Sequence, residues 1–364
     1  MVSKLLTKLS RARDQGGIIN YYWSRLLQEV AKRTETSIGK PTDVIILLTN
    51  RCNARCLHCH SWKLDSKISE LTTNEWKKTL KELRKWLGPI FLSITGGETL
   101  LRKDSVEIAE YAAKLGFWAE FLTNGYLMDD KKAAQLVKSG IRRIKISLDG
   151  SKSEIHDLIR GRRRFFEKAT KALKTLAKEK HKTGKKIQIW AKTTIMSHNV
   201  KDLANIVVLV QKLGIDGVEF QALEPVYYSE QLNDPNWYKN NPLWIEDKST
   251  MIDSLEELKM LKKEGYPILN SIENIELMKQ YFLNPDKLAF KIHSHMYKKK
   301  RPECTSWVAG LQIMPDGGMK MCHRMEPFAN VKQGNLKKLW RTRKRCWKSG
   351  CVLNSYSKQN EKDR

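Results

Sequence analysis

The sequence lacks any apolar run as long as the roughly 18 residues of a membrane-spanning helix, and its first residues lack the apolar core of a secretory signal peptide. Acidic residues are also scarce: 40 Asp and Glu stand against 67 Lys and Arg, giving a net charge of +27. The missing apolar runs exclude a membrane-spanning helix and predict a cytoplasmic protein. The surplus of positive charge predicts either a solvated lysine-rich surface or a surface that binds an anionic partner.

Cysteine is scarce and unevenly placed. Of seven cysteines, three lie in one short loop, Cys52, Cys56 and Cys59, just after an apolar run. This uneven set indicates a reducing compartment and metal ligation rather than disulfides. Three thiolates can hold three corners of an iron–sulfur cube and leave one iron open to another ligand. The alternative is zinc, because His58 or His60 would complete a Cys₃His site.

Two further polar motifs follow apolar runs. Gly96 and Gly97 precede Glu98, and a glycine pair lets a backbone approach a ligand closely while the carboxylate suits a cationic amine. Ser147 and Asp149 end a later run, and their hydroxyl and carboxylate suit the hydroxyls of a ribose. The sequence therefore predicts a site for a ligand with an amine and a sugar.

These motifs together resemble those of the radical S-adenosylmethionine (SAM) enzymes. The matching features are the Cys-x3-Cys-x2-Cys loop, the Gly-Gly-Glu and the Ser-Leu-Asp-Gly, within residues 44–223. Thr99 stands where the family usually has proline, which leaves the ligand chemistry unchanged. His58 stands where an aromatic residue is usual, so a planar ring beside the cofactor is kept.

The resemblance implies a [4Fe–4S] cluster on the three cysteines, with SAM chelating the open iron. It places the SAM amine at Glu98, the ribose at Ser147 and Asp149, the adenine along the backbone near Leu223, and His58 beside the cofactor. It further implies that the reduced cluster cleaves SAM to a 5′-deoxyadenosyl radical, which abstracts hydrogen from a substrate carbon. An electron donor such as flavodoxin or ferredoxin is the implied partner. No other catalytic residue is predicted.

Short apolar runs alternate with amphipathic segments through residues 41–223, which predicts an α/β fold with a parallel sheet. The predicted strands are 44–48, 90–94, 118–122, 143–148, 186–194 and 217–221. The predicted helices are 72–87, 105–115, 129–139, 165–182 and 200–213. Every motif follows a strand, and ligands of parallel sheets bind at the carboxyl ends of strands. The resemblance implies a partial (β/α)₆ barrel, open on one side.

Residues 1–40 form a predicted basic helical appendage, with apolar residues at helical spacing in 2–13 and 18–31. It either covers an open edge of the domain or makes a basic amphipathic contact with a membrane or partner. Residues 224–303 are predicted to be a linker with helices at 248–263 and 272–282 and a loop at 233–242. Four aromatic residues there are either core or walls of a substrate cleft: Tyr227, Tyr228, Trp237 and Trp244.

The second cysteine set is Cys304, Cys322, Cys346 and Cys351, within a predicted small module, 304–353, ahead of a disordered tail at 354–364. A β-hairpin is predicted at 311–322 and a short helix at 336–341. Four thiolates can close either a cube or a structural zinc site. The spacing resembles the SPASM and "twitch" extensions of radical SAM enzymes, and four cysteines suffice for one auxiliary [4Fe–4S] cluster. Basic residues crowd this module, at 298–301 and 341–345.

Three functions are compatible with the sequence. The first is modification of a ribosomally made peptide, which the long linker and the basic surface favour. The second is oxidation or epimerisation of a small alcohol or sugar, which one auxiliary cluster suits. The third is a non-enzymatic nucleic-acid-binding protein with structural metal sites, although no recognised nucleic-acid motif is present.

Overall fold

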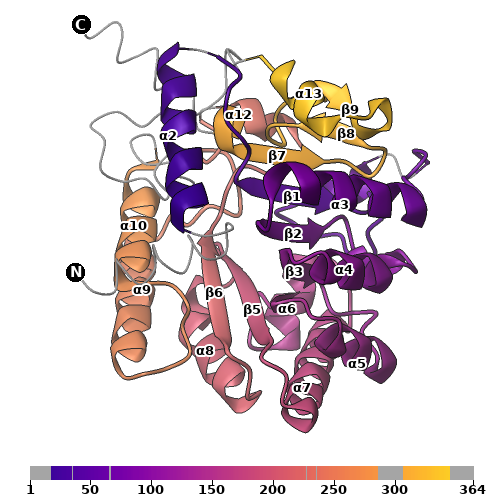
Figure 1. Ribbon diagram of the computed structural model, residues 1–364. Helices are drawn as coiled ribbons and strands as arrows, with labels where there is room; N and C mark the ends of the chain where they lie inside the picture. The colour runs from indigo at the N-terminus through magenta and orange to yellow at the C-terminus, as the bar shows by residue number, and fades with distance from the viewer. Residues whose placement is uncertain are drawn as a thin grey trace, which may run out of the picture.

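Six apolar segments form neighbouring parallel strands in the computed structural model, which describes residues 18–34, 36–64, 67–226, 228–234, 236–285 and 306–344 (Figure 1). The strands lie in sequence order across the sheet, as consecutive right-handed crossover units require. Each predicted strand is confirmed to within two residues at either end. The six are β1 (Asp43–Leu47), β2 (Phe91–Thr95), β3 (Trp118–Thr123), β4 (Arg143–Ser147), β5 (Gln188–Ile195) and β6 (Gly217–Ala222).

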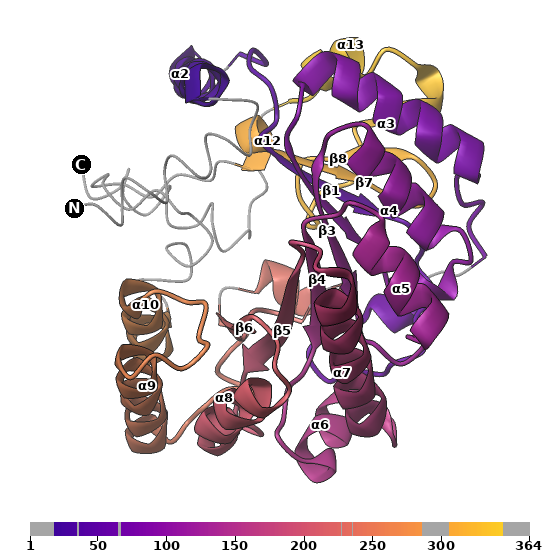
Figure 2. The ribbon, with the colours of Figure 1, turned by 60° about the horizontal axis from the view of Figure 1, so that its bottom comes forward.

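Amphipathic helices connect these strands and cover one face of the sheet (Figure 2). The first begins with a capping box, in which Thr72 accepts from the amide of Glu75 and the Glu75 carboxylate accepts from the amide of Thr72. One helix, α6, was not predicted. The helices are α3 (Thr73–Leu87), α4 (Ser105–Lys114), α5 (Asp130–Lys138), α6 (Ser153–Arg160), α7 (Phe165–Thr183) and α8 (Leu203–Lys212).

Alternation along the strands separates an apolar face from a polar one. Ile46, Leu92, Phe121, Ile144 and Ile189 are fully buried and belong to one hydrophobic core. Burying such a side chain contributes about 1.5–3 kcal/mol each, so this face holds the sheet and helices together. The residues between them are mostly polar, and they form the interior face of the partial barrel.

The predicted C-terminal hairpin is present, but it extends the main sheet. Its first strand, β7 (Gly310–Ile313), pairs in parallel with β1, and β8 (Gly318–Lys320) and β9 (Ala329–Asn330) follow antiparallel. The result is one nine-stranded sheet in the order β6-β5-β4-β3-β2-β1-β7-β8-β9. Helices α12 (Ser306–Ala309) and α13 (Leu336–Arg341) flank these strands, and α13 has the predicted bounds.

Arg343 is one of the basic residues that crowd this region, and only 4% of it is exposed. Its guanidinium donates to the carbonyls of Trp307 at 2.7 Å and Ser37 at 2.8 Å, and to that of Trp340 at 2.7 Å. It therefore joins the end of α13 to α12 and to the segment after the N-terminal helix. The neighbouring Arg341 is exposed.

The linker after β6 contains the two predicted helices, α9 (Lys248–Lys263) and α10 (Ile272–Leu283). They pack as an antiparallel pair, tied by ion pairs of Lys259 and Lys279 with Glu256 and Glu276. The predicted loop at 233–242 is also confirmed. Short 3₁₀ turns complete the described structure: η1 (Ser61–Lys63), η2 (Thr99–Leu101), η3 (Val200–Asp202), η4 (Glu230–Asn233) and η5 (Val331–Gln333).

The N-terminal helix, α2 (Ile18–Thr34), lies at the periphery of the molecule (Figures 1 and 2). Gln28 fastens it by donating to the carbonyl of Lys40 at 3.0 Å and to the hydroxyl of Thr42 at 3.2 Å. The helix predicted at 2–13 lies outside the described residues. No helix in the described ranges is long and apolar enough to cross a membrane.

Candidate active site

The cysteine loop follows β1 and is hydrogen-bonded to the segment that follows β2. The amide of Gly97 donates to the carbonyl of Thr49 at 2.8 Å, and the amide of Glu98 donates to the carbonyl of Arg51 at 2.8 Å. The loop after β3 joins them, because the Asn124 amide group donates to the side-chain oxygen of Asn53 at 2.8 Å. The two predicted motifs therefore meet at the carboxyl edge of the sheet, and the loop after β3 joins them there.

The two glycines serve this contact between loops. A Cβ on Gly96 would lie 2.7 Å from the carbonyl oxygen of Thr49, and one on Gly97 would lie 2.4 Å from that of Arg51. Both neighbours are backbone atoms, which have little room to move. Close approach to a ligand was the predicted reason for these glycines; the structure gives close approach to the cysteine loop itself.

The three cysteines pack around one small apolar cluster. Cys52, Cys56 and Cys59 contact the group formed by Ala54 and Phe165. Burial raises the pKa of the Cys52 thiol to about 12 and that of Cys59 to about 11. Three adjacent thiols of this kind ionise together only when positive charge is bound among them, so the donor set suits a cationic metal centre.

Two histidines lie in the same loop as these thiols, His58 and His60. Among the described residues, no group of three Cys, His, Asp or Glu side chains is placed to hold a single metal ion. Burial lowers the pKa of His58 to about 4, so its ring is neutral.

Glu98 lies at the start of η2 and is 1% exposed. Its Oε1 accepts from the amide of Leu100 at 2.9 Å and the hydroxyl of Thr123 at 2.5 Å, and its Oε2 accepts from the amide of Asn124 at 2.7 Å. Burial raises the pKa of Glu98, and these three donors oppose that effect. An ionised carboxylate accepts about four hydrogen bonds, so one position on Oε2 remains for a cationic donor.

The two residues predicted to bind a ribose, Ser147 and Asp149, differ in their exposure and in their contacts with the protein. Ser147, at the end of β4, is partly exposed. Asp149 is fully buried, its Oδ1 accepts from the amide of Thr194 at 2.8 Å, and its Oδ2 forms an ion pair with Arg160. Although burial opposes ionisation, Arg160 holds the pKa of Asp149 below its usual value. Asp149 is therefore held against Arg160, and its assignment to a ribose hydroxyl stays a prediction.

Arg160 is the main residue that the sequence reasoning missed. It ends α6, is 8% exposed, and its Nη1 lies 3.5 Å from Sγ of Cys56. Its Nε has no hydrogen-bond partner among the described residues, so the guanidinium keeps a free donor beside the cysteines. A signal was available: His156 and Arg160 stand four residues apart, on one face of a helix that directly follows the Ser-Leu-Asp-Gly motif.

Helix α6 also docks directly on the cysteine loop. The amide of Arg55 donates to the carbonyl of Arg160 at 2.8 Å, and the amide of Leu57 donates to that of Ile159 at 2.9 Å. Gly161, at φ +66°, closes the helix, and a Cβ there would lie 2.3 Å from the carbonyl oxygen of Arg55. The spacing of the three cysteines is therefore fixed from two sides, by α6 and by the Gly96–Glu98 segment.

Two aromatic residues after β6 reach this edge. Leu223 is fully buried, and its carbonyl accepts from the hydroxyl of Tyr281 at 2.9 Å. Tyr228 has a left-handed backbone at φ 62°, and burial, reinforced by the nearby Cys59, raises its pKa to about 12. Tyr228 thus lies beside the cysteine loop. Tyr227, the other tyrosine considered for a cleft wall, lies outside the described residues.

The interior face of the barrel carries a charged network below these loops. Glu120 forms ion pairs with Arg143 and Lys145, both at 3.3 Å, and Lys145 continues to Glu219 at 2.9 Å. The register places Lys192 between Ser147 on β4 and Glu219 on β6. Its charge contributes to the low pKa of both His58 and Glu219. Lys192 is therefore a cation between the network and the cysteine loop.

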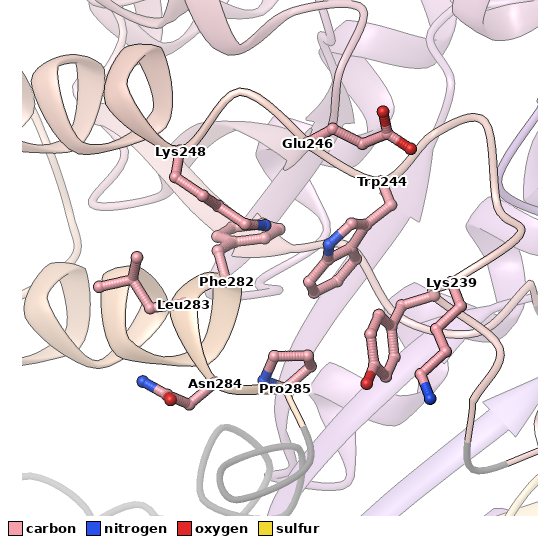
Figure 3. A pocket seen from close by; sticks show the side chains of 9 residues that line it. Lys239, Trp244, Glu246, Lys248, Phe282, Leu283, Asn284 and Pro285 are labelled. Carbon is pink, nitrogen blue, oxygen red and sulfur yellow. The ribbon is translucent and has the colours of Figure 1, made fainter.

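A cavity of about 490 Å³ lies beside the carboxyl edge (Figure 3). Trp244 and Phe282 face one another in its wall, with ring centroids 5.2 Å apart, and Lys248 approaches the same ring of Trp244 at 5.2 Å. The amide of Ser197, after β5, donates to the carbonyl of Leu243 at 2.9 Å and fixes this loop to the sheet. Trp237 and Trp244 both belong to the hydrophobic core, at 4% and 6% exposure, and Trp244 also lines the cavity.

The second cysteine set lies elsewhere, as far as it is described. Cys322 follows β8, which runs antiparallel to β7, so it lies at the amino edge of β1 and β7. A five-residue strand spans about 16 Å, so Cys322 is separated from the first loop by roughly that length. The other three members lie outside the described residues: Cys304, Cys346 and Cys351.

A parallel sheet with a partly buried loop of three cysteines, an acid and a guanidinium at its carboxyl edge is the arrangement of an α/β protein with a candidate metal centre. Residues 46–210 match the family model of the Radical SAM superfamily. Over these residues the chain is similar to the radical SAM enzymes, the family that its motifs resemble. Proteins of that family use SAM and a [4Fe–4S] cluster, and this likeness favours an enzyme over the non-enzymatic alternative.

Curated proteins from other organisms are similar in sequence to parts of this chain. It is 31% identical over 233 residues, 64% of this chain and 55% of the relative, to an Fe-coproporphyrin III synthase of Methanosarcina barkeri. It is 31% identical over 147 residues, 40% of this chain and 38% of the relative, to a PqqA peptide cyclase of Bradyrhizobium diazoefficiens. The chain thus spans about half, or less, of the curated relatives it matches.

The fold is similar to that of Streptococcus suis SuiB bound to S-adenosylmethionine, with a TM-score of 0.63, 15% identity, and coverage of 87% of this chain and 69% of that one. SuiB has also been solved bound to precursor peptide SuiA, with a TM-score of 0.62, 15% identity, and coverage of 90% of this chain and 73% of that one. At this identity, the likeness shows the shared α/β fold.

Proposed function

We propose that the chain binds a [4Fe–4S] cluster through Cys52, Cys56 and Cys59, and SAM beside it, to modify a peptide substrate. Bound together, the two cofactors supply one-electron cleavage of SAM and abstraction of hydrogen from a substrate carbon. The observation that carries the proposal is the hydrogen-bonded junction of the cysteine loop with the Glu98 segment, which keeps three thiols and a carboxylate with a free acceptor position at one edge.

The chain's own residues then have distinct tasks in holding SAM. Glu98 accepts from the SAM amine at the remaining position of Oε2, and Ser147 remains the candidate for a ribose hydroxyl. Arg160 offers its free Nε to a nearby anionic group, and Asp149 keeps the guanidinium oriented through their ion pair. His58 and the backbone near Leu223 remain candidates for the aromatic part of SAM, and the neutral ring of His58 suits that role.

An auxiliary [4Fe–4S] cluster on Cys304, Cys322, Cys346 and Cys351 is part of this proposal. Its support comes from described neighbours of these cysteines. Ser306 and Met321 both lie against Gly310, and Arg343 is bonded to Trp307. The chain segments that lead to Cys304, Cys322 and Cys346 therefore approach the same edge of the sheet. With only four cysteines, a zinc site is the alternative, and an iron assay distinguishes the two.

A peptide substrate is favoured by the cavity beside the carboxyl edge and by the peptide-processing names among the relatives. The cavity offers aromatic walls and the cations Lys239 and Lys248, which suit an apolar or aromatic side chain next to an acid. A second candidate is a carboxylate-bearing small molecule. It is favoured by Lys192 on the interior face and by the relative named Fe-coproporphyrin III synthase.

The test of the core proposal is SAM cleavage by the anaerobically reconstituted full chain with dithionite, followed as 5′-deoxyadenosine and methionine. Glu98→Gln is expected to weaken SAM binding by roughly 10- to 150-fold, because a hydrogen bond to a charged group contributes about 1.5–3 kcal/mol. Glu110→Gln, a partly exposed acid on α4, is the matched control and is expected to bind SAM normally. Unchanged affinity in Glu98→Gln would show that Glu98 is misassigned, and absence of cleavage by the wild type would overturn the proposed function.

A further inference from the structure

Helix α2 exposes several large apolar residues. Trp23, Leu26 and Val30 are 59%, 53% and 37% exposed, and at about 100° per residue they fall within one arc of the helix. The side against the protein carries Gln28 and Ala31, at 3% and 0% exposure, and the partly buried Leu27, which lines a cavity there together with the edge of Trp23. An amphipathic helix that packs on a domain normally turns its apolar side inward, whereas this arc of α2 remains exposed.

The exposed apolar residues are concentrated in this region. The described part of the chain contains eight large apolar residues that are highly exposed, and five of them fall within residues 22–38. Scattered single residues of this kind are ordinary on protein surfaces, but a contiguous set indicates an interaction site. Figure 2 shows α2 nearly end-on at the edge of the molecule, away from the carboxyl edge that carries the candidate active site.

Charge and residue type indicate which partner this face fits. Residues 1–40 contain eight lysines and arginines against three acids, and Arg33, with 77% of its side chain exposed, lies on the same side of α2 as Leu26. Tryptophan beside leucine and valine, bordered by cations, is the pattern of helices that lie in the headgroup layer of a membrane. A single convex helix also suits a flat lipid surface better than it suits a protein groove.

We propose that α2 binds the surface of membranes that contain anionic lipid, with Trp23, Leu26 and Val30 entering the headgroup region. The cations attract the helix to an anionic surface, an effect that salt screens, and burial of the apolar side chains adds an attraction that salt does not screen. The helix lies on the membrane without crossing it, and the enzyme is thereby held at a lipid surface through an element separate from its active site.

The test is co-sedimentation of the reconstituted full chain with large unilamellar vesicles. Vesicles of phosphatidylglycerol and phosphatidylcholine in equal parts are expected to bind it, and pure phosphatidylcholine is expected to bind it at least tenfold more weakly. The double variant Trp23→Ser/Leu26→Ser is expected to lose at least tenfold in affinity for the anionic vesicles. Its SAM cleavage is expected to stay unchanged, since neither residue belongs to the active site.

The matched control is Leu158→Ser/Met260→Ser, whose two side chains are each 55% exposed on other helices. It removes as much exposed apolar surface and is expected to bind vesicles like the wild type. Equal loss in both double variants, or no binding by the wild type, would overturn the proposal. So would a wild-type dimer in sedimentation velocity that becomes a monomer in Trp23→Ser/Leu26→Ser, because a second copy would then be the partner of this face.

Discussion

Two buried arginines, Arg160 and Arg343, have different roles in this protein. Arg160 forms an ion pair with Asp149 through one side of its guanidinium, and its Nε remains a free donor beside Cys56. Arg343 donates hydrogen bonds to backbone carbonyls of three separate segments. Its guanidinium carbon also lies 3.7 Å from the centre of the Trp340 ring. The first arrangement leaves a donor for a ligand, whereas the second joins segments of the backbone and has a structural role. The same residue type in the same basic chain therefore has roles that charge alone cannot distinguish.

Arg343→Ala is expected to lower the midpoint of chemical unfolding, because several buried carbonyls lose their donor. Leaving a buried polar group unsatisfied costs about 1–3 kcal/mol, so we expect a loss of at least about 2 kcal/mol. Arg341→Ala, two residues earlier and exposed, is the control and is expected to change stability by no more than about 0.5 kcal/mol. Anaerobic urea titrations of both variants measure this. Equal midpoints would show that Arg343 does not join these segments.

At the scale of elements, the cysteine loop is a short segment without regular structure that is held by its neighbours. On one side, backbone carbonyls at the end of α6 accept hydrogen bonds from the amides of Arg55 and Leu57. On the other side, two amides of the Gly96–Glu98 segment donate to carbonyls of the loop. A buried loop needs such partners for its own amides and carbonyls. The spacing of the cysteines thus depends on two elements that follow β2 and β4.

Gly97→Ala is expected to displace the cysteine loop, because its Cβ would lie 2.4 Å from the carbonyl oxygen of Arg51 and 2.6 Å from that of Asn50. We expect the purified, reconstituted variant to lose most of the iron of the first cluster and its SAM cleavage. The control is Gly214→Ala, at φ +66° with open space around the Cβ, which bears only the backbone cost and is expected to keep its iron. Full iron content in Gly97→Ala would contradict this account of the loop.

At the scale of the molecule, the length of a strand separates Cys322 from the first cysteine loop. The first loop lies at the carboxyl edge of β1, and Cys322 lies at the amino edge of the adjoining β7. Cys322 therefore cannot share one metal centre with Cys52, Cys56 and Cys59. The pairing of β7 with β1 also makes the described residues 306–344 part of the same core as the sheet that carries the first loop.

This separation predicts independent iron contents. The wild type is expected to hold about eight iron atoms per chain after anaerobic reconstitution, because two cubes hold four each. Replacing Cys52, Cys56 and Cys59 with alanine is expected to leave about four, and Cys322→Ala is likewise expected to leave about four. Iron and sulfide assays with Mössbauer spectra measure both. An unchanged iron content in Cys322→Ala would remove the auxiliary cluster, and stoichiometric zinc would replace it with a structural site.

The sequence by itself determined the strands and most helices, and it placed three cysteines in one short loop. Period-two and helical apolar spacing, the capping box at Thr72 and the tight Cys-x3-Cys-x2-Cys spacing are local, so they act before any distant contact forms. Only the tertiary structure decided that Asp149 belongs to Arg160, that the glycines serve the cysteine loop, and that Arg343 is buried. It also decided that β7 joins β1 and that an apolar arc of α2 remains exposed. Each of these depends on which distant segments pack together, and no local pattern records that.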